Sequence, residues 1–456
     1  MKLNIEKAIY GGAGLARAEG KAVFVPMALP GETVEVATKR EKSSFAEAEL
    51  LEVLATSPDR VAAPCPYYGA CGGCQYQHAS YEAQLAMKRN ILEETLGRAG
   101  LRDLPEIATH AREPWGYRNR IRLHVDAANH ALGYRRRGSH ALLPVEFCPI
   151  AAPLLETAIA ALGDVFREEK SGSWCAEVEL FINEESSTLL LSLGQRQGAR
   201  AGLSDLQQVC EVARERIPAL RGAGLFAPAA PRDTRQGTRR GRGGQKALAD
   251  EPDGEAAAGS LLAVWGEGTL VYRVGGNRYR VSLGAFFQGN RFLVDKLTEL
   301  ATTGPGGALA WDLFAGVGLF AQVLTGRFDR VVAVEGSPIS AGNLRQNLPE
   351  GKDRVVASST LAFLERFLER PPELKKREVP DLVVLDPPRA GLGAQASSLL
   401  ARVRSPHITY VSCDPATLSR DLRVMVDAGY TISQLDLLDM FPQTFHLETV
   451  ARLRLR

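Results

Sequence analysis

The stretch that decides the fold is Ala308-Leu-Ala-Trp-Asp312-Leu-Phe314-Ala-Gly316-Val-Gly318-Leu-Phe320. It predicts an apolar strand that ends in an aspartate, followed by a glycine turn that opens a helix; such glycines let a ligand approach the backbone. The next predicted strand, residues 330–334, ends at Glu335, where an acidic side chain is suited to bind ribose hydroxyls. From about Tyr279 onward, β-like and helical stretches alternate, which predicts a Rossmann-like, doubly wound sheet in a multidomain α/β protein.

The glycine turn also indicates the class of cofactor. The dinucleotide fingerprint Gly-Xaa-Gly-Xaa-Xaa-Gly is incomplete because position 321 is Ala, and an aromatic residue lies inside the turn. An adenosyl cofactor without a pyrophosphate fits better. The pattern therefore favours S-adenosylmethionine over NAD.

Two later strands end in residues that can carry chemistry. Residues 381–385 lead into Asp386-Pro-Pro-Arg389-Ala-Gly391, which resembles the catalytic loop of amino-methyltransferases. In that loop an aromatic residue stacks on the base, and Arg389 stands in its place, which counts against amino methylation. Residues 408–411 lead into Ser412-Cys413-Asp-Pro and place Cys413 at the C-terminal tip of a strand, where open α/β sheets bind ligands.

The surroundings of Cys413 allow two interpretations. A helix expected from about Pro415 would point its first amides back at the thiol and favour the thiolate, as a nucleophile requires. A buried structural cysteine is the alternative. Further along, Glu448 closes the run Asp439-Met-Phe-Pro442-Gln-Thr-Phe-His446-Leu-Glu448. A carboxylate flanked by apolar residues can have a raised pKa and act as a general base.

The composition limits the class of protein. At 456 residues, with 45% hydrophobic and 24% charged residues, the chain is expected to form two or three soluble globular domains. The net charge of +2 is nearly balanced, so any nucleic-acid surface has to come from local clusters of Lys and Arg. No apolar run reaches the roughly 18 residues of a membrane span, and the N-terminus has no signal-like core. We therefore expect a cytoplasmic monomer with no membrane partner.

The N-terminal residues 1–57 alternate short β-like runs with glycine turns. Closely spaced strands of this kind predict a small OB-like β-barrel that could bind oligonucleotides, with a purely structural barrel as the alternative. The pattern Gly12-Ala-Gly-Leu-Ala16, Val23-Phe-Val-Pro26 and Pro30-Gly31-Glu32 resembles the TRAM domain, a small RNA-binding barrel appended to RNA-modifying enzymes.

A cysteine cluster marks the predicted central α+β domain, residues 58–270. Cys65, Cys71 and Cys74 lie within ten residues, and glycines between them let the backbone fold round a ligand. Zinc usually takes paired Cys-Xaa-Xaa-Cys units, and only one is present. A [4Fe–4S] cluster needs four thiolates, and Cys148, which precedes a proline, is a natural fourth ligand. Such a closed cluster would be structural or RNA-positioning; scattered buried cysteines are the alternative.

Two other segments of this domain have unusual composition. Residues 115–124 and 133–139 interleave aromatics with arginines, which suits stacking on bases and contact with phosphates; solvated strand faces are an equal alternative. Arg118, Arg120 and Arg122 would share one face of a strand. Residues 227–259 are of low complexity and predict disorder or a long surface loop.

These motifs together carry a resemblance that covers almost the full length. The chain resembles the RNA uracil-5-methyltransferases, most of all the 23S ribosomal RNA branch with a TRAM domain and an iron–sulfur cluster. The most specific pieces are Phe286-Phe-Gln288-Gly-Asn290, Asp312-Leu-Phe-Ala-Gly-Val-Gly318, Asp386-Pro-Pro-Arg-Ala-Gly391, Ser412-Cys413-Asp-Pro-Ala-Thr and Pro442-Gln-Thr-Phe-His-Leu-Glu448. Residues 271–456 would form the Rossmann-like methyltransferase domain.

The resemblance implies roles for individual residues. Cys413 would attack C6 of uracil, Glu448 would remove the C5 proton, and Asp386 would hold the uracil edge. Gln288 would lie near both cofactor and base, and Phe314 would contact S-adenosylmethionine together with Gly316, Gly318, Glu335 and Asp386. Cys65, Cys71, Cys74 and Cys148 match the family's [4Fe–4S] ligands.

Three rival interpretations remain open at the level of sequence. An enzyme with the same chemistry could act on transfer RNA. An RNA-binding assembly factor could keep the fold and lack turnover, although the nucleophile and base are intact. A redox protein could use the cluster for electron transfer, but no flavin or second-cluster motif is present.

Overall fold

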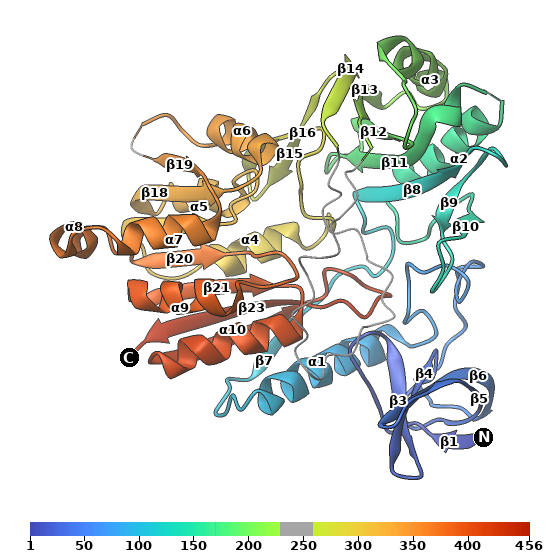
Figure 1. The fold of residues 1–456 in the computed structure, drawn as a ribbon, viewed down its shortest axis with the longest axis horizontal. Helices are drawn as coiled ribbons and strands as arrows, with labels where there is room; N and C mark the ends of the chain where they lie inside the picture. Colours follow the sequence, from blue (N-terminus) through green and yellow to red (C-terminus); the bar gives the residue numbers. More distant parts are fainter. Residues whose placement is uncertain (169, 229–258, 352) are drawn as a thin grey trace. The chain divides into compact units, whose positions relative to one another are not determined.

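The computed structural model describes residues 1–168, 170–228, 259–351 and 353–456. The chain forms two compact units, each built from segments that are distant in sequence (Figure 1). Unit 1 contains Met1–Ser80, Arg118–Thr269 and Gln443–Phe445; unit 2 contains Tyr81–Tyr117, Leu270–Pro442 and His446–Arg456. Of the predicted low-complexity segment 227–259, all but residues 227, 228 and 259 lie outside the described residues.

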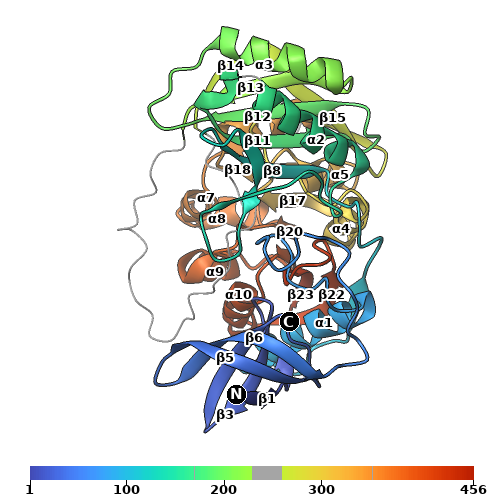
Figure 2. The same cartoon turned by 90° about the vertical axis from the view of Figure 1, so that its right-hand side faces the viewer.

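The first sheet of unit 1 has six strands in the order β1-β5-β6-β4-β3-β2. Its core consists of short side chains, such as Ala16, Val23 and Val25, which let the strands pack closely. Figure 2 shows these strands crossing one another in a strongly twisted sheet. The strands are β1 (Lys2–Asn4), β2 (Lys7–Ala8), β3 (Ala13–Ala18), β4 (Lys21–Pro26), β5 (Thr33–Glu41) and β6 (Phe45–Ala55).

The second sheet of unit 1 has seven strands in the order β10-β9-β8-β11-β12-β13-β14, and helices α2 and α3 pack on it. Apolar residues of the sheet and of both helices form one continuous core. The elements are β8 (Arg120–Asp126), β9 (Ala131–Arg135), β10 (Leu142–Pro144), α2 (Pro153–Glu168), η1 (Lys170–Trp174), β11 (Cys175–Ile182), β12 (Leu189–Gln195), α3 (Leu203–Arg216), β13 (Leu220–Phe226) and β14 (Leu261–Gly266).

Unit 2 is built on an eight-stranded sheet in the order β19-β18-β17-β20-β21-β23-β22-β7. The strands are β7 (Ile107–His110), β17 (Gly307–Leu313), β18 (Phe328–Glu335), β19 (Arg354–Ala357), β20 (Leu382–Leu385), β21 (His407–Ser412), β22 (Tyr430–Leu438) and β23 (Glu448–Leu455). The helices are α1 (Tyr81–Arg98), α4 (Val294–Thr302), α5 (Leu319–Leu324), α6 (Pro338–Asn347), α7 (Thr360–Leu368), α8 (Pro372–Arg377), α9 (Gly393–Val403) and α10 (Pro415–Asp427). The hairpin β15 (Thr269–Val274) and β16 (Asn277–Ser282) packs against α5 and α6. The predicted doubly wound sheet is confirmed.

The strand order creates a topological switch point between β17 and β20. The chain runs outward from β17 to β18 and β19, then returns to β20 and continues the other way to β21. Right-handed crossovers therefore put α5 and α6 on one face and α7, α9 and α10 on the other (Figure 1). Ligands of open α/β sheets bind at the carboxyl ends of the strands beside such a point.

Residues 81–117 extend the sheet of unit 2. Strand β7 pairs in parallel with β22, and α1 packs against α10. Lys88 of α1 is fully buried and lies 2.5 Å from Asp439, which follows β22. The predicted central domain had included residues 81–117, because nothing local in their sequence identifies a partner 351 residues away. None of the described helices is both long and apolar enough to cross a membrane.

Candidate active site

The candidate active site lies at the carboxyl edge of the unit 2 sheet, where β20 and β21 end. Asp386 directly follows β20 and Cys413 directly follows β21, and these strands are parallel neighbours. Strand β23 runs antiparallel to β21, with Ser412 opposite Thr449, so its first residue, Glu448, lies at the same edge. The sheet thus brings together one thiol and two carboxyl groups from motifs that are distant in the sequence.

Several groups set the proton affinity of Cys413. Burial raises the pKa of its thiol, and the Glu448 and Asp386 carboxyl groups raise it further. The Arg389 guanidinium acts in the opposite direction and lowers the pKa. Arg389 therefore favours the thiolate of Cys413.

Two of the first amides of α10 are bonded to the cap residue of the helix. Asp414 caps the helix, and its carboxylate accepts hydrogen bonds from the amides of Ala416 (3.0 Å) and Thr417 (2.8 Å). The Asp414 carboxylate also raises the pKa of Cys413. The position of Cys413 between a strand and a helix is confirmed, whereas stabilisation of its thiolate by this helix terminus stays a prediction.

The two carboxyl groups of the site are coupled through burial and charge. Gln288 Nε2 donates to Asp386 Oδ2 at 3.1 Å. Burial raises the pKa of Asp386 to about 7, and the hydrogen bond from Gln288 opposes this rise. Burial raises the pKa of Glu448 well above its ordinary value; Asp386 adds to the rise and Arg389 opposes it. Among the residues described, nothing hydrogen-bonds the buried Oε1 of Glu448, so this oxygen can take up a proton.

Sequence reasoning gave no role at this site to Arg389 and His446. Arg389 Nη2 lies 3.1 Å from His446 Nδ1, and the His446 ring meets that of Phe441 edge-on, with centroids 5.9 Å apart. The signal in the sequence is Arg389 itself, the residue after Asp-Pro-Pro, which by sequence alone counts only against amino methylation. Its charge acts on both Cys413 and Glu448.

The glycine turn after β17 has the backbone of a ligand-binding loop. Phe314, Gly316 and Gly318 all have positive φ (61°, 56° and 97°). A non-glycine residue at positive φ is uncommon and is found at ligand-binding turns. A Cβ on Gly318 would lie 2.8 Å from a Leu344 methyl, whereas a Cβ on Gly316 would meet nothing within 4 Å. There is open space next to Gly316.

Glu335 stands at the end of β18, as predicted, and braces this turn. Its Oε2 accepts from the Gly316 amide at 2.8 Å, and its Oε1 accepts from the Ser337 amide at 2.6 Å. Each carboxylate oxygen retains a further lone pair for a ligand hydroxyl. The buried Asp312 accepts from the Ala321 amide at 2.8 Å and thereby fixes the start of α5.

Comparison with known proteins agrees with this geometry. Residues 271–455 match the family described as tRNA (Uracil-5-)-methyltransferase, and residues 2–51 match the TRAM domain. A 23S rRNA (uracil(1939)-C(5))-methyltransferase of Chromohalobacter salexigens is 36% identical, covering 98% of this chain and 88% of its own length. The chain belongs to the RNA (uracil-C5)-methyltransferase family.

A second relative supports this family, and a solved structure shares the fold. An RNA methyltransferase of Aquifex aeolicus is 31% identical over 100% of this chain and 99% of its own length. The solved structure of the Pyrococcus abyssi tRNA (uracil-54, C5)-methyltransferase superposes with a TM-score of 0.72, covering 99% of this chain and all of its own, at 21% identity. The predicted methyltransferase domain and N-terminal TRAM domain are thus confirmed.

The four predicted cluster ligands of this methyltransferase lie within electrostatic reach of one another in unit 1. Burial raises the pKa of Cys71 to about 11, and Cys148 and Cys65 contribute to the rise. Burial likewise raises the pKa of Cys74, with contributions from Cys148 and Cys71. Across the described ranges, however, no group of three or more His, Cys, Asp or Glu side chains is arranged to hold a metal ion. The four thiols are therefore near one another but are not spaced as the ligands of one ion.

The predicted arginine face of β8 is largely paired within unit 1. Arg122 donates to Glu179 at 2.8 Å, and Arg120 lies 3.8 Å from the same carboxylate. The Arg120 guanidinium also stacks over the Phe181 ring at 4.2 Å. Glu179 thus offsets part of the positive charge of Arg120 and Arg122, while the RNA-binding role predicted for these arginines stays a prediction.

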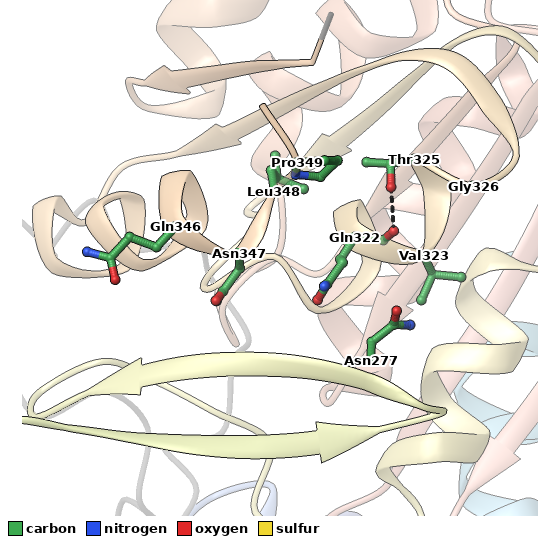
Figure 3. A pocket seen from close by; sticks show the side chains of 9 residues that line it. All are labelled: Asn277, Gln322, Val323, Thr325, Gly326, Gln346, Asn347, Leu348 and Pro349. Carbon is green, nitrogen blue, oxygen red and sulfur yellow. Dashed lines mark hydrogen bonds between the residues drawn. The ribbon is translucent and has the colours of Figure 1, made fainter. Parts of the chain in front are cut away.

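One cavity of unit 2, of about 500 Å³, lies apart from the active site (Figure 3). Amide side chains line it, among them Asn277, Gln322 and Gln346, and the Thr325 hydroxyl donates to the Gln322 carbonyl at 2.8 Å. It lies where α5 and α6 end, after both helices have returned toward the amino ends of the strands. None of the predicted site residues lines it.

Proposed function

We propose that this chain transfers a methyl group from S-adenosylmethionine to C5 of a uridine in 23S ribosomal RNA. The observation that carries the proposal is the meeting of Cys413, Asp386 and Glu448 at one sheet edge, under the influence of Arg389. The glycine turn after β17, the strand next to β20, opens at the same edge.

C5 of uracil is too weak a nucleophile to take a methyl group unaided. Attack of the Cys413 sulfur on C6 forms an S–C6 bond and moves the C5=C6 electrons toward O4, which gives an enolate with a nucleophilic C5. S-adenosylmethionine, when bound, supplies the electrophilic methyl group. Glu448 then takes the C5 proton, the C5=C6 bond re-forms, and the sulfur leaves C6.

The raised pKa of Glu448 suits the role of base, because a higher pKa means a greater affinity for the proton. Its buried Oε1 is the oxygen we assign to this step. Arg389 lowers the pKa values of Cys413 and Glu448, so it stabilises the negative charge that develops on sulfur and on the carboxylate.

The uracil edge and the cofactor share neighbouring groups in this proposal. Asp386, held by Gln288, would bind the polar edge of the base and, with Gln288, border the cofactor. Because Asp386 has a pKa of about 7, it can donate or accept a hydrogen bond at neutral pH. A base that reacts at C6 has to be unstacked, and the 42% exposed Phe286 ring, two residues from Gln288, offers it a stacking surface.

S-adenosylmethionine would be held by the turn after β17 and by Glu335. Gly316 leaves open space for the adenosyl group to approach the backbone, and Gly318 and Phe314 set the turn. Glu335 would accept from the ribose hydroxyls with its remaining lone pairs.

The assignment to ribosomal RNA rests on the named relatives. Enzymes named for 23S rRNA uracil-1939 methylation from Chromohalobacter salexigens, Halomonas elongata and Shewanella amazonensis are 36%, 33% and 32% identical and match nearly the full chain. Transfer RNA is the second candidate, because the family that matches residues 271–455 is described by that substrate.

We further propose that Cys65, Cys71, Cys74 and Cys148 hold a [4Fe–4S] cluster. Such a cluster needs four thiolate ligands, and these four cysteines could supply them; the thiols raise one another's pKa values, so they lie near one another. With four thiolate ligands the cluster would be closed and would stabilise this part of unit 1. Iron and sulfide in stoichiometric amounts in anaerobically purified protein are expected; zinc in their place would contradict the proposal.

The first test of the reaction uses 5-fluorouridine-substituted ribosomal RNA with S-adenosylmethionine, followed by denaturing electrophoresis. Fluorine at C5 cannot leave as a proton, so Cys413 should stay covalently bound and shift the protein band. Cys413→Ala should lose the shift, and Cys210→Ala, a buried cysteine of α3, should retain it. A shift with transfer RNA alone would move the substrate to the second candidate, and no shift with either RNA would refute the catalytic role.

A further inference from the structure

The loop that carries Arg389 is held by the helix that begins beside Cys413. Three hydrogen bonds join α10 to this loop, residues 386–392. The Thr417 hydroxyl donates to the Arg389 carbonyl at 3.1 Å, and Arg420 Nη2 donates to the Ala390 carbonyl at 2.9 Å. The Leu392 amide donates to Asp421 Oδ2 at 2.8 Å.

Asp421 is itself fixed from several sides. Its side chain is fully buried, it accepts from the Tyr410 hydroxyl at 2.8 Å, and Arg420 Nε donates to its other oxygen at 2.9 Å. Gly391 has a φ of +69°, and a Cβ there would lie 2.5 Å from Asp421 Oδ2. The backbone of the loop therefore packs directly against the helix, which leaves the loop little freedom to move.

The proposed nucleophile lies directly before the same helix. Cys413 precedes the cap residue Asp414, and the Thr417 hydroxyl reaches the Asp414 carbonyl at 3.3 Å as well as the Arg389 carbonyl. The backbone beside the sulfur and the backbone of Arg389 are thus bridged by one hydroxyl group. The Arg389 side chain then reaches His446, two residues before Glu448.

We propose that Thr417, Arg420 and Asp421 are positioning residues that fix the Arg389 guanidinium relative to Cys413 and Glu448. Helix α10 and the loop after β20 then act as one rigid element that carries both the nucleophile and its counter-charge. This inference rests on the proposed function, in which Cys413 is the nucleophile, and it adds the residues that hold the counter-charge in place.

The test compares two substitutions on the same helix. Thr417→Val keeps the shape of the side chain and removes the hydroxyl, whereas Thr417→Ser keeps the hydroxyl. Ser419→Ala is the matched control, because the Ser419 hydroxyl bonds the Ala416 carbonyl within the helix and does not contact the loop. The readout is the rate at which iodoacetamide alkylates Cys413, followed by mass spectrometry of its peptide, without RNA or cofactor.

Below the pKa of a thiol, its thiolate fraction falls tenfold for each unit by which the pKa rises. Loss of one hydrogen bond that orients Arg389 should slow alkylation of Cys413 and lower kcat about fivefold in Thr417→Val. In Thr417→Ser and Ser419→Ala, Cys413 should be alkylated at the wild-type rate. The KM for S-adenosylmethionine should not change, because the Gly316 turn is untouched.

Alkylation and turnover at wild-type rates in Thr417→Val would overturn the inference, and so would an equal loss in Ser419→Ala. Asp421→Asn keeps the size of the side chain but removes its charge. It should also slow the alkylation of Cys413, which gives a second measurement. The fluorouridine adduct separates this inference from the proposed function. An adduct together with unchanged alkylation in Thr417→Val refutes the positioning alone, whereas slowed alkylation without an adduct from wild-type protein refutes the reaction alone.

Discussion

Asp386→Asn should stabilise unit 2 at high pH and leave it little changed at low pH. Burial raises the pKa of Asp386 from 3.8 to about 7 in the folded protein. A carboxyl group with a raised folded pKa contributes stability below its ordinary pKa, and this contribution is lost as the pH rises toward the folded value. Asparagine is neutral throughout and does not incur this loss.

The size of the stability difference can be worked out for the interval from pH 5 to pH 8. Between pH 5 and pH 7 the contribution of the wild-type carboxyl group to the free energy of unfolding falls by about 1.4 kcal/mol per pH unit. Above pH 7 this fall levels off. The stability difference between Asp386→Asn and wild type should therefore widen by about 3 kcal/mol between pH 5 and pH 8. The hydrogen bond from Gln288 persists, because the asparagine carbonyl can accept it.

Tryptophan fluorescence during urea unfolding can follow unit 2 alone. Of the four tryptophans, Trp115 and Trp311 belong to unit 2, so a background with Trp174→Phe and Trp265→Phe reports on that unit. Asp427→Asn is the control, because Asp427 is 57% exposed and pairs with Arg423 on the surface of α10. A stability difference for Asp386→Asn that stays constant from pH 5 to pH 8 would refute the reasoning.

Three further predictions concern other parts of unit 2. Glu448→Gln should still add to C6 and accept the methyl group but stall before elimination, so a protein–RNA adduct should accumulate on a denaturing gel; normal turnover without adduct would assign the base to another group. Glu335→Gln should weaken S-adenosylhomocysteine binding about tenfold by calorimetry, because a hydrogen bond to a charged acceptor is lost; unchanged affinity would remove Glu335 from the cofactor site. Lys88→Met should destabilise unit 2 by about 3–5 kcal/mol, since it leaves the Asp439 carboxylate buried without its ion pair. Adding Asp439→Leu should restore most of that stability in urea unfolding, and a double variant as unstable as the single one would show that the charge is not the cause.

The fold of unit 2 could be predicted from sequence because its signals are local. Apolar strands alternate with helices, and Asp386 and Cys413 follow their strands directly, with Glu335 closing its own. In a doubly wound sheet these positions lie at one edge, so the site could be located before any contact was known. The TRAM domain could be predicted for the same reason, since its strands and glycine turns are short-range features.

The pairing of distant segments could not be predicted in this way. Strand β23 lies between β21 and β22 and runs antiparallel to β21, and this direction places Glu448 at the same end of the sheet as Cys413. Likewise, residues 81–117 join unit 2 through contacts such as Lys88 with Asp439, 351 residues apart. Hydrophobic periodicity reports which face of an element is buried, but it does not report which partner buries it.

The sequence by itself determined the class of sheet and the edge at which Asp386 and Cys413 end their strands, and it predicted the roles of nucleophile and base. The tertiary structure decided the protonation of that site. Asp414 binds two of the first amides of α10. Burial raises the pKa values of Cys413, Asp386 and Glu448, and Arg389 opposes that rise at both Cys413 and Glu448. The physical reason is that a pKa depends on burial and on charges a few ångströms away, which chain order does not specify.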